Sequence, residues 1–315
     1  MYDYNRNWAN NQMKKLNWIF DTLLSNETRV KIERVFLVIA LISFVLHLSL
    51  ICLVKFGVVS LSEGSDLLTN PISAIYTPFS FILVYEVYLL IYFLPKSLTT
   101  YINKQYEIIL LIIIRRLFKD LSSLKISSDW FVIKNDLQFT FDIITSIVLF
   151  FLIFHFYKQS NRKFPVSGAD DSSLERTRRY MKIKRAIASS LVPLILILAI
   201  YSFVNWLGVA FFKPEGSAMA FTNINNVFFE EFFTILVLVD VVLLLVSFFY
   251  TDRFHLIIRN SGFIISTILI RISFSTEGVM NNILVVVAVL FGLAILNLYN
   301  SFEKALASEG SDRMV

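Results

Sequence analysis

The chain has 315 residues, of which 56% are hydrophobic and only 17% are charged, and its formal net charge is +5. A soluble domain of this length would carry more charge and would interrupt its apolar runs more often, so this composition excludes an ordinary soluble globular protein. Several apolar runs approach the length of about twenty residues that crosses about 30 Å of hydrocarbon, and they predict an all-α integral membrane protein.

The N-terminal segment 1–30 predicts an amphipathic helix on the membrane surface. Apolar residues from Trp8 to Leu24 recur at helical spacing with charged residues between them, which is typical of an interfacial helix. A helix that binds a protein partner would show the same pattern. The first residues are polar and lack the apolar core of a signal peptide, so we expect the first span itself to direct insertion.

Eight apolar runs follow this segment, and each is a candidate transmembrane helix. The predicted spans cover 35–56, 74–95, 101–119, 137–157, 188–212, 228–250, 257–275 and 280–299. The third run contains several charged side chains and, taken alone, is also compatible with an interfacial helix. Its counterpart in the second half, 257–275, is more apolar and supports counting the third run as a span.

The distribution of basic residues favours eight spans with both termini in the cytoplasm. That topology places 21 of the 29 Lys and Arg residues in cytoplasmic segments and five in outer segments, as the positive-inside rule requires. If the third span lay flat, every later segment would change sides and the basic linker 158–187 would face outward. We therefore predict cytoplasmic termini and a bacterial inner (plasma) membrane location.

The two halves of the chain repeat each other. A Glu-Gly-Ser sequence begins at Glu63 and again at Glu215, a Thr-Asn pair follows each, and an acid inside an apolar run comes 16 positions after the first pair and 17 after the second. Each half has an even number of spans, so the two repeats are expected to be parallel. The predicted organisation is an amphipathic segment 1–30, a four-helix repeat 31–157, a basic cytoplasmic linker 158–187, a second four-helix repeat 188–300 and a tail 301–315.

Four charged residues are the principal candidate site. Glu86 and Asp240 lie within apolar runs, and Arg115 and Arg271 follow them by 29 and 31 positions. Counted from the basic residues at the inner ends of their spans, both arginines lie roughly 16–18 Å deep, near the depth of the acids. Because an unpaired charge at the bilayer centre costs at least about 2.5–3.5 kcal/mol, we predict the ion pairs Glu86–Arg115 and Asp240–Arg271.

Two residues without charged counterparts in the other half, Arg116 and Asp142, are secondary candidates. The three histidines are too scattered for a metal site, and no phosphate-binding loop or nucleophile motif occurs, so neither a metal nor a cofactor nor an enzymatic activity is expected. Basic patches interleaved with aromatic residues are also absent, which argues against binding to nucleic acid.

Two functions remain compatible with these observations. In the first, the acid–arginine pairs lie on or beside a route by which a small ion or solute is conducted, transported or sensed. In the second, the pairs are structural clasps in a non-transporting scaffold or complex subunit whose cytoplasmic segments recruit partners. The lipid bilayer is the expected environment in both cases, the basic linker can attract anionic lipid head groups, and a homo-oligomer or a membrane complex is compatible with either.

Overall fold

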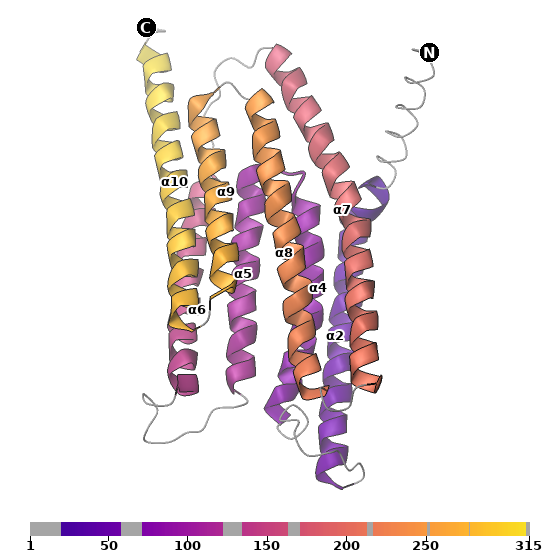
Figure 1. The fold of residues 1–315 in the computed structure, drawn as a ribbon. Helices are drawn as coiled ribbons and strands as arrows, with labels where there is room; N and C mark the ends of the chain where they lie inside the picture. Colours follow the sequence, from indigo (N-terminus) through magenta and orange to yellow (C-terminus); the bar gives the residue numbers. More distant parts are fainter. Residues whose placement is uncertain are drawn as a thin grey trace, which may run out of the picture. The chain divides into compact units, whose positions relative to one another are not determined.

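The chain is almost entirely helical and contains no strand over the residues described by the computed structural model (Figure 1). Those residues are 20–57, 71–121, 134–162, 171–212, 217–250, 253–276 and 278–312. The helices are α2 Asn26–Lys55, the 3-10 helix η1 Pro71–Ile75, α4 Tyr76–Phe93, α5 Leu98–Leu121, α6 Lys134–Ser160, α7 Asp171–Phe212, α8 Ser217–Tyr250, α9 Phe254–Phe274 and α10 Val279–Asp312. Most of the predicted amphipathic segment 1–30, the first Glu-Gly-Ser sequence, and Glu215 and Gly216 of the second lie outside the described residues.

Five described helices are long and apolar enough to cross a membrane, which confirms the prediction of an integral membrane protein of the all-α class. They are Asn26–Lys55, Leu137–Ser160, Phe232–Tyr250, Phe254–Phe274 and Val279–Ser308. Their outward faces carry exposed large apolar side chains, such as Leu46 on α2, Phe150 on α6 and Leu238 on α8. In water such faces would be unstable, whereas lipid tails solvate them.

The other three predicted spans are helical, but over the described residues they are not among the helices that are long and apolar enough to cross a membrane. The second corresponds to a shorter apolar helix, Thr77–Phe93. The third, 101–119, lies within α5, and the fifth, 188–212, lies within α7. The total of eight spans, the parallel repeats and the orientation of the termini therefore stay predictions.

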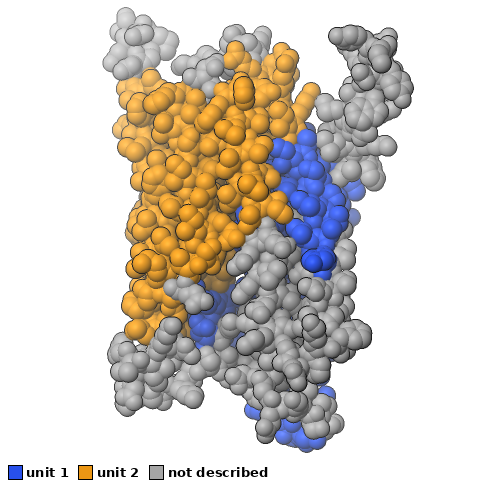
Figure 2. Space-filling view, in the orientation of Figure 1, with its two compact units in different colours: residues 1–95, 115–124, 185–233 blue, residues 96–114, 125–184, 234–315 orange. Residues whose placement is uncertain are grey.

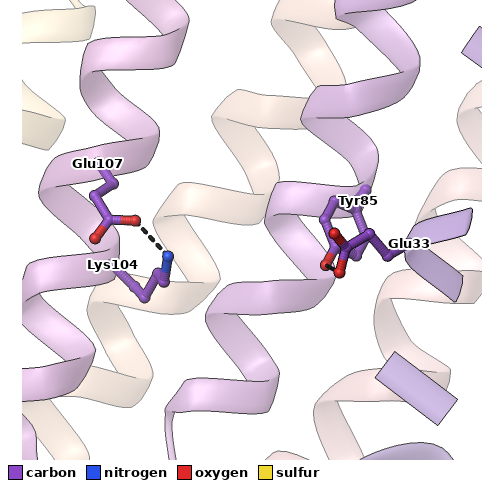
Figure 3. A network of polar contacts seen from close by, with 4 residues as sticks. All are labelled: Glu33, Tyr85, Lys104 and Glu107. Carbon is purple, nitrogen blue, oxygen red and sulfur yellow. Dashed lines mark hydrogen bonds and ion pairs between the residues drawn. The ribbon is translucent and has the colours of Figure 1, made fainter. Parts of the chain in front are cut away.

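The chain forms two compact units, which Figure 2 colours separately. In the first unit, which includes residues 1–95, α2 packs against α4. Ser25 begins α2 by accepting a hydrogen bond from the Thr28 backbone N–H at 3.1 Å, as N-cap residues do. The Tyr85 hydroxyl on α4 donates to the Glu33 carboxylate on α2 at 3.0 Å (Figure 3), which gives this helix pair a polar link inside an apolar contact.

The second unit comprises residues 96–114, 125–184 and 234–315. Within it α10 packs against both α9 and α6. Aromatic rings from three helices form part of its core, with Phe156 of α6 lying 5.0 Å from Tyr106 of α5 and 5.6 Å from Phe263 of α9 between ring centroids. All three side chains are fully buried.

A tight turn joins α9 to α10. Gly278 adopts φ +70 in this turn, a conformation that favours glycine because it has no Cβ. The two helices then approach closely, since a Cβ added at Gly262 would lie 2.7 Å from the Ile295 side chain.

Candidate functional site

Asp240, in the second unit, is a buried acid within an apolar helix. It lies on α8 ten residues before the last residue of the helix, Tyr250, and is only 1% exposed. Leu236, Leu243 and Ser247 are also buried, and with Asp240 they recur at spacings of three and four, which places all four on one face of α8. Helical periodicity thus directs this carboxylate toward the protein interior rather than toward lipid.

Two polar side chains from α5 surround the Asp240 carboxylate. Gln105 donates from Nε2 to Oδ2 at 3.0 Å, although the two residues are 135 positions apart in the chain. The Tyr101 hydroxyl, one helical turn before Gln105, lies beside the carboxylate without making a well-aligned hydrogen bond to it. Oδ1 of Asp240 and the Tyr101 hydroxyl are therefore buried polar atoms with no hydrogen-bond partner among the described residues.

A buried ammonium group lies near this site without joining the carboxylate. Lys184 of α7 is 2% exposed, and its Nζ donates to the backbone carbonyl of Lys96 at 2.8 Å. The Tyr180 ring lies 5.4 Å from the same nitrogen, and the Tyr180 hydroxyl donates to the Leu243 carbonyl on α8 at 3.3 Å. Within the described residues, Asp240 forms no ion pair.

Lys184 precedes the predicted span 188–212, and its ionisation is shifted. Burial lowers the pKa of its ammonium to about 8, because enclosure away from water penalises the charged form. The negative charge of Asp240 acts in the opposite direction, and the guanidinium of Arg259 on α9 lowers this pKa further. A lysine in this state can gain or lose a proton close to neutral pH.

This shift predicts that the free energy of unfolding rises between pH 8 and pH 10. Lysine in an unfolded chain has a pKa near 10.4, so in this window the unfolded chain retains a proton that folded Lys184, with a pKa of about 8, has released. The rise due to this group should be roughly 2–3 kcal/mol. Chemical unfolding of the purified protein at several pH values should show it, and Lys184→Met should flatten the curve. Lys182→Met, at an exposed position on the same helix, should leave the slope unchanged, and a steep slope in Lys184→Met would contradict the assignment.

The predicted ion pair between Asp240 and Arg271 is wrong. Arg271 instead donates from Nε and Nη2 to Thr234 Oγ1 at 3.2 and 3.0 Å, and from Nη1 to Ser275 at 3.5 Å. The physical reason is helix register. Asp240 lies 10 residues before the end of α8, whereas Arg271 lies 17 residues after the start of α9, at Phe254. At 1.5 Å per residue this is a mismatch of about 10 Å along antiparallel helices, while Thr234, 16 residues before the end of α8, lies level with Arg271.

The first-half candidates lie on α4 and α5. Glu86, on α4, is half-buried, and so are Arg115 and Arg116 on α5. Each of the three has polar or electrostatic interactions. The pairing of Glu86 with Arg115 stays a prediction.

Asp142, a secondary candidate, is a fully buried carboxylate held by amide groups. Its Oδ1 accepts hydrogen bonds from Gln138 Nε2, one turn earlier on α6, at 2.7 Å and from Asn282 Nδ2 on α10 at 2.6 Å. Both donors are neutral, and one of them comes from the neighbouring helix. This arrangement links α6 to α10 and differs from the environment of Asp240, where one carboxylate oxygen has no aligned donor.

Sequence reasoning missed Tyr101, Gln105 and Lys184 as parts of the site. Gln105 was visible as a polar interruption of the weak third span, and Lys184 as one member of the basic cluster before the fifth span. The available signal was the spacing of four between Tyr101 and Gln105, which places them on one face of a helix. Nothing in the local sequence indicated that this face would meet Asp240.

No group of three or more His, Cys, Asp or Glu residues that could hold a metal ion occurs in the part of the chain that the structure describes. No protein-family model, no curated protein and no solved structure matches the chain. The fold and the site together define a class, a helical integral membrane protein with a buried intramembrane carboxylate.

Proposed function

We propose that this protein moves or senses a small charged species at the membrane and that Asp240 is the group that binds it. The observation that carries the proposal is the environment of the carboxylate, which is buried in an apolar helix and has one oxygen held by Gln105 and one without an aligned donor. Burying a carboxylate without a cationic partner costs several kcal/mol. Ionisable residues that persist at such a cost inside membranes are usually functional.

The topology that accompanies this proposal has eight spans in two parallel four-helix repeats, with both termini in the cytoplasm of a bacterial inner membrane. The asymmetric distribution of Lys and Arg supports this topology. The continuous helices α5 and α7, which contain two of the three remaining predicted spans, are compatible with it. In this orientation the Tyr250 end of α8 and Lys184 lie toward the cytoplasm.

A second candidate function is a non-transporting scaffold or complex subunit, and one specific observation favours it. Arg271 links α9 to α8 through Thr234, and Asp142 links α6 to α10 through Asn282. The scaffold hypothesis assigned the clasp role to acid–arginine pairs, and these polar contacts between neighbouring helices support a similar structural role. Asp240 does not fit this pattern, because its carboxylate lacks a complete set of donors.

The two functions predict different effects of the substitution Asp240→Asn on ion flux and on stability. If Asp240 is a binding group, the substitution should abolish ion flux in proteoliposomes while the free energy of unfolding stays equal or rises, because a buried unpaired charge has been removed. Asp142→Asn is the matched control and should lower stability, because the new amide accepts less strongly from its two donors. Flux should be measured for protons, sodium, potassium and chloride. A clear loss of stability in Asp240→Asn with unchanged flux would favour the scaffold.

Access of water to the carboxylate gives an independent test. In a Cys52→Ser background, Leu243→Cys places a thiol one turn from Asp240 on the same buried face of α8, and Leu238→Cys places one on the exposed apolar face. If charged species reach Asp240, a membrane-impermeant cationic thiol reagent should label position 243 and should not label position 238. Absence of labelling at both positions would indicate that water does not reach Asp240 and would favour a structural role for this residue.

A further inference from the structure

The oxygen atoms around Asp240 restrict which charged species the site can hold. Oδ2 already accepts the Gln105 N–H, and an N–H group cannot coordinate a cation. Oδ1 and the Tyr101 hydroxyl are the oxygens of these two groups that have no hydrogen-bond partner among the described residues. Calcium takes six to eight oxygen ligands and magnesium requires an octahedral set, whereas a proton needs only one carboxylate oxygen.

The positively charged groups near the site also argue against a metal cation as the bound species. The ionisable groups that face Asp240 and Lys184 are Tyr101 from α5, Tyr180 from α7 and Arg259 from α9, in addition to Asp240 and Lys184 themselves. Two of these five are cationic side chains. Fixed positive charge in a region of low dielectric repels a metal cation, but an ammonium can also supply a proton.

We propose that the charged species is the proton, which Asp240 binds and Lys184 exchanges with the aqueous phase. This inference rests on the proposed function and specifies its substrate. In the exchange step, an N–H bond of the Lys184 ammonium breaks and an O–H bond forms at Oδ1 of Asp240. The carboxylate becomes a neutral acid and the lysine becomes a neutral amine. The amine then takes a proton from water on its own side of the membrane.

The surroundings of Lys184 suit this role. The Lys96 carbonyl and the Tyr180 ring hold its ammonium, and its charge acts on the Asp240 carboxylate without forming an ion pair. Burial lowers the pKa of Lys184 to about 8, and proton exchange is most efficient when the pKa of the exchanging group lies near the working pH.

The test is proton flux in proteoliposomes that contain a pH-sensitive dye, driven by a potassium diffusion potential with valinomycin. The wild-type protein should carry protons, and Asp240→Asn should reduce the flux at least tenfold. Lys184→Arg keeps the positive charge but cannot give up its proton at ordinary pH, so it should slow the flux about as much as Lys184→Met. Ser247→Ala, on the same buried face of α8, is the matched control and should retain wild-type flux. Wild-type flux in Lys184→Arg would overturn the role of Lys184.

Two further outcomes separate this inference from the proposed function. Flux of sodium, potassium or chloride that depends on Asp240, without proton flux, would overturn the proton assignment and leave the proposed function intact. If no ion moves, proton uptake by the purified protein between pH 4 and pH 9 decides the matter. One more proton in the wild type than in Asp240→Asn would support the proton as a species that is sensed, and equal uptake would overturn the assignment.

Discussion

Replacing Asp142 with leucine is expected to cause one of the largest losses of stability of any single substitution in the second unit. The change removes the carboxylate oxygen that accepts hydrogen bonds from Gln138 and Asn282. A buried donor that loses its acceptor costs about 1–3 kcal/mol. Asn282 is 3% exposed, so water cannot readily replace the lost acceptor. Thermal or detergent-induced unfolding of the purified protein should show the loss directly.

The double variant Asp142→Leu with Asn282→Leu is the control that separates a hydrogen-bond effect from a packing effect. Replacing both partners of a buried polar contact by apolar groups of similar shape is often nearly neutral. The double variant should therefore recover much of the stability that the single variant loses. If the two losses simply add, the contact at 2.6 Å between these side chains is not what stabilises the pairing of α6 with α10.

The second large effect is expected at Gly292 of α10. A Cβ at this position would overlap the Tyr106 hydroxyl and would lie 3.0 Å from the ring carbon that carries it. Tyr106 is fully buried and its hydroxyl is hydrogen-bonded to Ser266 Oγ at 2.7 Å, so the ring has little room to move. Gly292→Ala should lower the free energy of unfolding by about 1–3 kcal/mol, the usual cost of overpacking a dense core.

Tyr106→Phe provides a partial rescue of Gly292→Ala. It removes the overlapping oxygen but leaves the ring carbon in tight contact, so the double variant should be more stable than Gly292→Ala and less stable than Tyr106→Phe alone. Ala294→Leu adds more atoms on an exposed face of the same helix and should have little effect. Unfolding measurements on the four variants form a double-mutant cycle with a control. Additive effects would contradict the close approach of α10 to α5.

The two buried acids of the second unit illustrate how burial alone does not define a site. Asp142 has its charge stabilised by two amide donors, whereas Asp240 retains an oxygen without an aligned donor beside an equally unsatisfied tyrosine hydroxyl. The first arrangement is expected to stabilise the packing of helices. We expect the second to be less stable than a neutral replacement, which is typical of a group retained for its chemistry.

The sequence by itself determined that the protein is helical and membrane-embedded, because the hydrophobic length needed to cross a bilayer is a property of each segment alone. It did not determine which face of α8 points inward, because the run around Asp240 is apolar on all sides. The depth of Arg271 could not be obtained in this way. The basic residue at the inner end of this span is Arg259, but α9 begins five residues earlier, at Phe254.

Only the tertiary structure decided the partners of the charged residues. A side chain that hydrogen-bonds to a residue 135 positions away, as Gln105 does to Asp240, leaves no trace in local periodicity. The relative register of two helices depends on where each begins and on how their side chains interdigitate, and a shift of seven residues moves a charge by about 10 Å. Local patterns therefore place Asp240 in an apolar run of membrane-spanning length, whereas packing determines that it faces inward and lies beside Gln105 and Tyr101 instead of Arg271.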